Sequence, residues 1–187
     1  MEEDIILFLQ SKSSIFLDIL CFIYSYLISW IGAILVFIII VFFVNRKFGL
    51  FFGFGFICTL IINYAIKVII NRPRPYETYP QIINKLQTIG KSFPSGHAVS
   101  CTFIVLTLLT LVYKISNRFK RGSIYIKVFS CLIGIIMIAF TAFTRMYLGQ
   151  HYLTDIVAGI LLSSFMFLLF YCIWNLKLKN LSNKSYK

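Results

Sequence analysis

Five long apolar stretches, separated by shorter polar segments, fill most of this 187-residue chain. They cover residues 22–44, 50–70, 98–113, 124–143 and 156–174. A helix needs about 20 apolar residues to cross the hydrocarbon core of a bilayer, and the two shorter stretches approach this length once flanking residues are added. The pattern therefore predicts an all-α, polytopic transmembrane helix bundle, with residues 1–187 in a single domain and no room for a soluble one.

The beginning of the chain follows a less regular pattern. Residues 3–11 include the apolar run Ile5 to Leu9, which is too short to span and predicts a helix lying at the membrane interface. Residues 15–44 are too long for one upright span and too short for two spans with a turn. We expect an interfacial or tilted start that runs into one span, with Gly32 as the candidate kink. A six-helix arrangement is the main alternative, so we expect five to six membrane helices.

The charges fix an orientation for this bundle. Only 13% of the residues are charged, yet 18 Lys and Arg against 6 Asp and Glu give a net charge of +12. Such a balance in a soluble protein would suggest a nucleic-acid partner. Here, if five spans alternate, eleven of the cations share one side: Arg46, Lys47, Lys114, Arg118, Lys120, Arg121, Lys127, Lys177, Lys179, Lys184 and Lys187. The positive-inside rule makes that side cytoplasmic. We therefore expect a multi-pass protein of the cell membrane that binds no nucleic acid, whose oligomeric state stays open.

The cysteines do not predict a metal site. Five cysteines lie singly in apolar segments, without the Cys-x-x-Cys spacing of metal sites, and such cysteines usually act as small hydrophobic residues. Cys101 is one helical turn from His97, and a metal or redox role for that pair is the weaker alternative. We expect no metal and no cofactor.

Three polar clusters lie at the other ends of the apolar stretches. The first joins Lys67 to Arg74-Pro75, the second is residues 94–97 (Pro-Ser-Gly-His), and the third is Arg145, His151 and Asp155. Five alternating spans place all three on the outer face, opposite the eleven cations. Because the count of cations did not require this agreement, it indicates a single site built from all three clusters.

Cations and hydrogen-bond donors in the three clusters could bind an anion. Arg74 and Arg145 carry planar guanidinium groups that match phosphate oxygens. Ser95 and Gly96, just ahead of a helix, can present a hydroxyl and backbone N–H groups at its positive end. An ammonium such as that of Lys67 is costly near a helix end in the membrane unless it reaches water or an anion. Together these groups would stabilise the charge on a transferring phosphoryl group.

The two histidines complete a possible reaction centre. His151 and Asp155 are four residues apart, so they meet on one helix face, and the carboxylate would leave one imidazole nitrogen free to attack. His97 is then available as general acid. Each cluster alone has an ordinary explanation: Lys67 could reach the interface, Ser95 could cap a helix, and His151 with Asp155 could be a structural pair. All three in order on one face favour the catalytic interpretation.

This combination of motifs resembles the type 2 phosphatidic acid phosphatase family, which shares its motifs with vanadium haloperoxidases and bacterial acid phosphatases. The family patterns are Lys-x6-Arg-Pro, Pro-Ser-Gly-His and Ser-Arg-x5-His-x3-Asp, and the chain matches them over residues 67–155. The one departure is Thr144 in place of Ser, which keeps the hydroxyl. The resemblance implies that His151 attacks phosphorus, Asp155 orients it and His97 protonates the leaving oxygen. The implied phosphate-binding residues are Lys67, Arg74, Ser95, Gly96 and Arg145.

The function implied by this resemblance is an integral-membrane lipid phosphatase that works without a metal, through a phosphohistidine, on the extracytoplasmic face. Undecaprenyl diphosphate is the favoured substrate, with phosphatidylglycerol phosphate or phosphatidic acid as alternatives. Residues 76–93 and the N-terminal segment are expected to face the substrate. A non-catalytic protein that binds or transports anionic lipid is the alternative from another class. Haloperoxidase activity is disfavoured because a site that opens to lipid suits amphiphiles.

Overall fold

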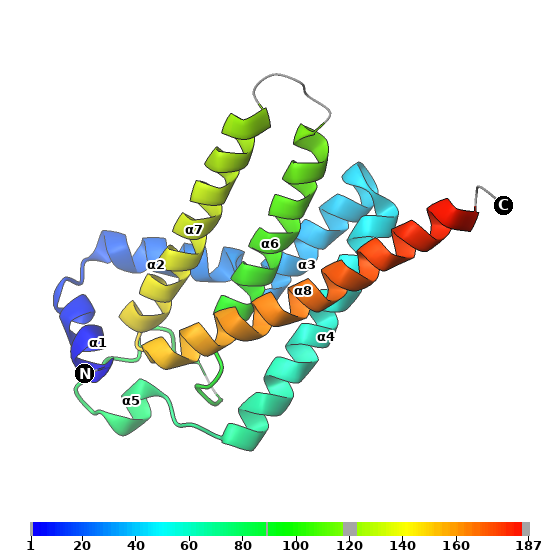
Figure 1. The fold of residues 1–187 in the computed structure, drawn as a ribbon. Helices are drawn as coiled ribbons and strands as arrows, with labels where there is room; N and C mark the ends of the chain where they lie inside the picture. The colour runs from blue at the N-terminus through cyan, green and yellow to red at the C-terminus, as the bar shows by residue number, and fades with distance from the viewer. Residues whose placement is uncertain (1, 89, 118–122, 185–187) are drawn as a thin grey trace.

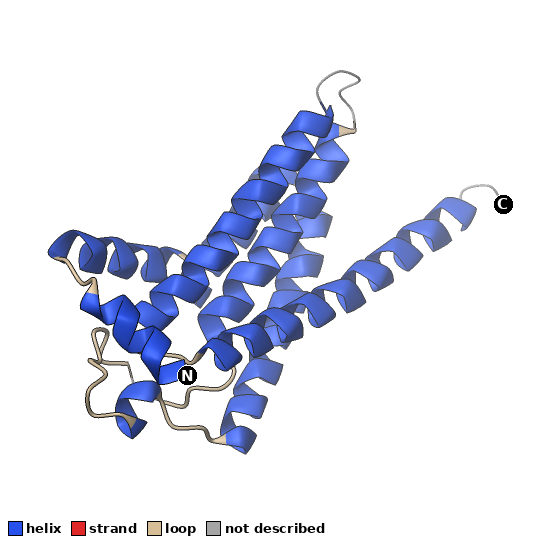
Figure 2. Cartoon of the chain, turned by 60° about the vertical axis from the view of Figure 1, so that its left-hand side comes forward, coloured by secondary structure: helices blue, strands red, loops and turns tan. Residues whose placement is uncertain are grey.

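The structure, a computed structural model, describes residues 2–88, 90–117 and 123–184, with only the backbone for 123 and 178–184. Within this part of the chain every regular element is helical (Figures 1 and 2). In chain order they are α1 (Glu2–Ser11), α2 (Ile15–Leu27), α3 (Trp30–Ile39), the π-helical segment η1 (Ile40–Val44), α4 (Arg46–Ile70), α5 (Pro75–Thr78), α6 (Gly96–Ser116), α7 (Ser123–Tyr147) and α8 (Leu153–Lys184).

Four segments are long and apolar enough to cross a membrane: Arg46–Thr78, Gly96–Ser116, Ile124–Tyr147 and Leu153–Lys177. The bent pair Ile15–Leu27 and Trp30–Val44 provides a fifth when it is counted as one span. The predicted all-α transmembrane bundle is thereby confirmed at four to five spans, and the described residues contain no sixth. The ten-residue helix α1 is too short to cross.

The first apolar run breaks earlier than Gly32. α2 and α3 meet at an angle of 53°, with Ile28 and Ser29 between them. Gly32 lies beyond the break, but a Cβ there would lie 1.8 Å from the carbonyl oxygen of Leu27. Glycine at this position therefore lets α3 leave the end of α2 at so tight an angle. As a result α2 lies across the lower half of α7, while α3 runs along α6 (Figure 1).

Helix α6 occupies the centre of the bundle, in contact with α3, α4, α7 and α8. Aromatic side chains fill the space around it; the buried set is Phe37, Phe48, Phe52, Phe56, Phe103, Phe167, Phe170 and Trp174. Gly55 of α4 faces the ring of Phe170 on α8, and a Cβ at this position would come within 2.8 Å of it. Burial of these rings and their mutual contacts hold α4, α6 and α8 together.

The two ends of the bundle differ in chemistry. The start of α4, the end of α6 and the start of α7 lie at one end, where Arg46, Lys47, Lys114 and Lys127 are found. Of the predicted cytoplasmic cations, Arg118, Lys120, Arg121 and Lys187 lie outside the described residues. The opposite end gathers α1, α5, the start of α6 and the turn from α7 to α8 (Figure 1). All three polar motifs belong to that second end.

Candidate active site

A tight turn between α7 and α8 places the residues of the third motif. Gly149 has a φ of 72°, a left-handed conformation that favours glycine, and a Cβ there would lie 2.5 Å from the carbonyl oxygen of Ile83. Beyond this turn the backbone N–H groups of Gln150 and His151 both donate to the carbonyl of Arg145, at 3.0 and 3.3 Å. The turn therefore folds His151 back over the last turn of α7, beside Arg145.

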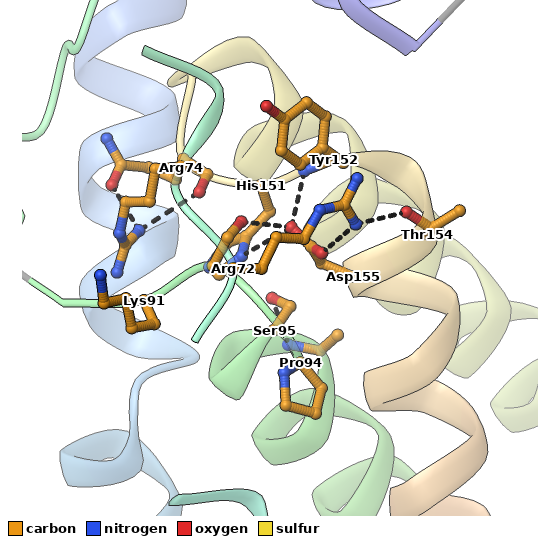
Figure 3. Close-up of polar contacts among 12 residues, drawn as sticks. Arg72, Arg74, Lys91, Pro94, Ser95, His151, Tyr152, Thr154 and Asp155 are labelled. Carbon is orange, nitrogen blue, oxygen red and sulfur yellow. Dashed lines mark hydrogen bonds and ion pairs between the residues drawn. The ribbon is translucent and has the colours of Figure 1, made fainter. Parts of the chain in front are cut away.

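Asp155, in the first turn of α8, lies next to His151. Its Oδ2 is 3.6 Å from His151 Nδ1, close to hydrogen-bond distance (Figure 3). The same oxygen accepts the backbone N–H of Tyr152 at 2.9 Å and the hydroxyl of Ser92. Because Asp155 is fully buried, these donors fix the carboxylate on the Nδ1 side of the ring. Nε2 of His151 is then the nitrogen free to face a substrate.

The surroundings of His151 keep it neutral. The side chain is 2% exposed, and burial, together with the positive charges of Arg145, Arg74 and Lys67, lowers the pKa of His151 to about 3, against the opposing effect of Asp155. A neutral imidazole retains the lone pair that a nucleophile needs. The residue therefore stays competent for attack throughout the neutral pH range.

Arg145 is buried at 1% exposure. Its Nη1 donates to the hydroxyl of Ser25 on α2 at 3.1 Å. Its Nε has no hydrogen-bond partner among the described residues. A buried cation with an unused donor is costly unless an anion compensates it, so this guanidinium is suited to hold one.

Arg74 lies at the start of α5 and is nearly buried. Its Nε donates to the carbonyl of Gly90 at 2.7 Å, and its Nη1 donates to the side-chain oxygen of Gln150 at 2.8 Å. Gln150 in turn donates to Asn84 at 2.7 Å. These bonds connect the first motif, the loop before α6 and the turn of the third motif, and they fix the direction of the guanidinium.

The ammonium of Lys67 forms its hydrogen bonds with backbone carbonyls in this structure. It donates to the carbonyl oxygens of Lys91 at 2.7 Å, Pro94 at 3.0 Å and Ser92 at 3.4 Å. These three bonds hold the loop that leads into the second motif. To contact a phosphate as predicted, the ammonium would have to exchange one of the carbonyls for the ligand.

The second motif begins α6 and is joined to the third. Ser95 is the N-cap of α6, and its backbone N–H donates to the carbonyl of Asp155 at 2.9 Å. Gly159 of α8 makes this approach possible, because a Cβ there would lie 2.7 Å from the carbonyl oxygen of Ser95. Gly96 follows as the first residue of the helix, so its N–H belongs to the positive end of α6.

His97 points toward α2. Its Nε2 is 3.2 Å from the carbonyl oxygen of Ser25, which can only accept, so Nε2 carries the proton in this contact. Ser25 therefore contacts two residues of the predicted site, His97 through its carbonyl and Arg145 through its hydroxyl. For His97 to protonate a leaving group from Nε2, it would first release this carbonyl.

Through these contacts the structure brings all three motifs to one end of the bundle. Lys67 reaches the second motif, the second motif joins Asp155, and Arg74 joins the turn that carries His151. In the part of the chain that the structure describes, no group of three His, Cys, Asp or Glu side chains could hold a metal ion.

The sequence reasoning missed several residues that hold this site: Ser25, Arg72, Ser92 and Gln150. Arg72 offered a signal, since it forms a second Arg-Pro pair directly before Arg74-Pro75. Ser25, Ser92 and Gln150 offered none, because single hydroxyl and amide residues are common and their partners are up to 120 positions away.

Comparison with known proteins decides the family. A model of the PAP2 superfamily matches residues 48–179, which is more than half of the chain and includes all three motifs. The chain belongs to the PAP2 superfamily. The resemblance predicted from Lys67 to Asp155 is thus confirmed at the level of the family.

Several relatives of this PAP2 protein are named for phosphatase activities. It is 25% identical to an undecaprenyl-diphosphatase of Sulfolobus acidocaldarius over 123 residues, 65% of this chain and 53% of that one. It is 26% identical to undecaprenyl-diphosphatase BcrC of Bacillus subtilis, over 68% of this chain and 58% of that one. Sphingosine-1-phosphate phosphatase 2 of Mus musculus is 28% identical, over 64% of this chain and 32% of that one. The matched region thus spans from about a third to somewhat over half of these relatives' lengths.

Two solved structures share the fold. A transmembrane PAP2 type phosphatidylglycerolphosphate phosphatase from Bacillus subtilis superposes with a TM-score of 0.75 at 18% identity, covering 93% of this chain and 84% of that one. Aquifex aeolicus LpxE gives a TM-score of 0.70 at 17% identity, covering 90% and 93%. The PAP2 protein is therefore a multi-pass membrane protein with the transmembrane fold of these structures.

Proposed function

We propose that this PAP2 protein is a metal-independent lipid phosphatase that hydrolyses a phosphate or diphosphate headgroup through a phosphohistidine at His151. The observation that carries the proposal is the buried pair of Arg145 and His151 at one turn. Among the described residues the Nε donor of Arg145 has no partner. His151 is neutral and has Nδ1 toward Asp155, which leaves Nε2 as the nitrogen for attack. An oxyanion placed between them would occupy the unused donor and lie in reach of the nucleophile.

The reaction would proceed in two balanced steps. In the first, the lone pair of His151 Nε2 attacks phosphorus, and the P–O bond to the lipid breaks as the N–P bond forms. The leaving oxygen takes a proton from His97, while Asp155 accepts a hydrogen bond from Nδ1 and stabilises the positive charge on the ring. In the second, a water loses a proton to His97 and its oxygen attacks phosphorus. The N–P bond breaks, and inorganic phosphate leaves.

The phosphate oxygens would be held by Arg74, Arg145, Ser95, Gly96 and Lys67. The guanidinium groups suit the equatorial oxygens of the transferring group. The N–H of Gly96 at the start of α6 adds a donor at a positive helix end. Lys67 would join by exchanging one of its three carbonyl partners for a phosphate oxygen.

We favour undecaprenyl diphosphate as the substrate, with phosphatidylglycerol phosphate and phosphatidic acid as alternatives. Two relatives are named undecaprenyl-diphosphatases, and α2, beside the motifs, exposes the apolar side chains Ile15, Phe16, Ile19, Ile23 and Leu27. Such a helix face is suited to contact lipid tails while its inner side contacts the site. The protein would lie in the cell membrane, with the motifs on the extracytoplasmic face and the Lys- and Arg-rich end inside.

The test is phosphate release by the purified protein from undecaprenyl diphosphate, phosphatidylglycerol phosphate and phosphatidic acid in detergent micelles. We expect turnover of the diphosphate to be the fastest, and His151→Ala to lower kcat by about 10⁴-fold or more because the nucleophile is gone. Lys12→Ala, which removes an exposed side chain outside the motifs, serves as the control. Wild-type protein without turnover on all three lipids would favour a binding protein, and unchanged turnover in His151→Ala would remove His151 as nucleophile.

A further inference from the structure

Arg72 lies between the first motif's lysine and arginine and contacts the carboxylate of Asp155. Its Nη1 donates to Asp155 Oδ1 at 2.6 Å and to the hydroxyl of Thr154 at 2.7 Å. The guanidinium also stacks over the ring of Tyr152, 4.0 Å from its centre. Figure 3 shows the guanidinium of Arg72 next to Asp155, between Tyr152 and Thr154. Three neighbours thus fix its position.

The two oxygens of Asp155 have different partners. Oδ1 accepts from Arg72, whereas Oδ2 accepts from Ser92 and the backbone of Tyr152 and is the oxygen nearest His151. A carboxylate anchored at Oδ1 by a charged donor cannot rotate without losing that bond. Arg72 therefore acts together with Ser92 and the backbone of Tyr152 to hold the carboxylate with Oδ2 toward the imidazole.

Arg72 is itself held from the N-terminal helix. Glu2 of α1 accepts from Arg72 Nη2 at 3.2 Å and, through its other oxygen, from the backbone N–H of Thr154 at 2.8 Å. The helix is kept in place by Ile6, which is fully buried against Ile82 and Tyr152. A chain of contacts thus runs from α1 through Arg72 to the buried carboxylate.

We propose that Arg72 is a positioning residue for the His151–Asp155 pair and that Glu2 of α1 holds Arg72 in that role. The kinetic part rests on the proposed function, but the geometric part, the orientation of the imidazole, does not. Nη1 and Nη2 of Arg72 both contact protein side chains. Arg72 thus differs from Arg145, whose Nε has no partner in the described part of the chain. Arg72 would therefore affect the reaction through Asp155 and not through substrate binding.

The charged groups around His151 set the direction of the pH effect. They come from α4, the start of α5, α6, α7 and α8, and are Lys67, Arg74, His97, Arg145 and Asp155. Of these groups only Asp155 favours the protonated imidazole. The positive charge of Arg72, paired with the Asp155 carboxylate, weakens that effect. Removing Arg72 should raise the pKa of His151, so the acid limb of kcat/KM should move to higher pH. A role limited to folding would not move that limb.

Selective labelling gives a direct test, because the chain contains only two histidines. With ¹⁵N-histidine protein in micelles, and His97→Asn to assign the signals, we expect His151 in one neutral tautomer with the proton on Nδ1. Arg72→Gln should give a mixture of the two neutral tautomers. Arg72→Lys should give a smaller change, because lysine keeps the charge but loses the planar guanidinium. Glu2→Gln should give the smallest change of the three. Lys12→Gln removes a cation at the same end without touching Asp155 and should match wild type.

Kinetics with the lipid that the wild type turns over best complete the test. We expect Arg72→Gln to lower kcat by about 10- to 100-fold, because loss of a partner that orients a site residue commonly has an effect of this size. KM and the inhibition constant of inorganic phosphate should stay within about threefold of the wild-type values. Glu2→Gln should lower kcat by up to about fivefold, since both partners are part-exposed. Loss of phosphate affinity in Arg72→Gln would make Arg72 a substrate contact instead.

The possible failures are distinguishable. If Arg72→Gln keeps the wild-type tautomer, kcat and acid limb, the inference is wrong whatever the reaction is. If the wild type turns over no lipid, the proposed function fails while the tautomer experiment still tests Arg72. Should Arg72→Gln not fold, Arg72→Lys and Glu2→Gln carry the same test, and wild-type spectra and kcat in both would overturn the inference.

Discussion

The N-terminal residues 2–27 and the region 48–179 both reach the site, but they contribute in different ways. The second region matches the PAP2 superfamily and holds every residue to which we assign chemistry. The first lies outside that match and supplies partners for those residues: Glu2 for Arg72 and Ser25 for Arg145 and His97. The residues proposed to act on a substrate can thus be found from their motifs, whereas the residues that contact them are visible only in the folded chain.

After the loss of His151 itself, the largest effect should follow a change at Arg145, inside the family region. Arg145→Lys keeps the charge but loses the planar fork at a buried position, so we expect kcat/KM to fall about 100-fold or more. Phosphate release measures the loss, with Arg46→Lys at the opposite end of the bundle as control. A decrease of less than about threefold would mean that Arg145 does not grip the transferring group.

A smaller effect should come from the packing of α1. Ile6→Ala removes a fully buried side chain from the contact with Ile82 and Tyr152, which should destabilise the protein by about 2 kcal/mol, the lower end of the range for such changes. Thermal unfolding in micelles measures it, and Phe8→Ala on the exposed face of the same helix is the control. Equal melting temperatures for the two variants would mean that α1 does not pack as described.

Ser25 tests the link between α2 and the motifs. Ser25→Ala leaves Arg145 Nη1 without its hydroxyl partner, so kcat should fall about tenfold, in line with the free-energy cost of a lost bond to a buried charge. Ser29→Ala removes a hydroxyl that donates to the carbonyl of Tyr26 in its own turn, away from the motifs, and should leave kcat unchanged. If both variants behave alike, the α2 contact does not support the site.

The smallest effect should follow metal removal. The proposed mechanism uses cationic side chains where other phosphatases use metal ions, so turnover after dialysis against EDTA should stay within about twofold of the untreated rate. A loss of activity that Mg²⁺ or Zn²⁺ restores would contradict a metal-independent reaction. Orthovanadate, a phosphate mimic, should inhibit in the same assay, and the inhibition should disappear in Arg145→Lys.

The sequence predicted the spans and the grouping of the motifs because both depend on simple patterns. Apolar length gave the helices, and alternation of five spans placed Lys67, His97 and His151 at one end, where the structure also has them. His151 and Asp155 lie close together as predicted, but not on one helix face, because His151 precedes α8 and the turn at Gly149 places it beside Asp155.

The remaining features could not be predicted for physical reasons. The bend at Ile28 and Ser29 depends on how α3 packs against α6. The length of an apolar stretch contains no information about the direction in which a helix packs. The roles of Gln150 and Ser25 depend on partners 76 and 120 positions away. Lys67 was predicted to hold phosphate, and no sequence pattern indicated that its ammonium donates to three backbone carbonyls.

The central claim is that His151, held by Asp155 and surrounded by Lys67, Arg74 and Arg145, forms a covalent bond to phosphorus. Rapid alkaline quenching of the wild type during turnover of lipid labelled with ³²P in its terminal phosphate tests this claim most directly. We predict acid-labile, alkali-stable label on the peptide that contains His151, and none in His151→Ala. Steady turnover in the wild type without trapped label, or label that persists in His151→Ala, would contradict the account.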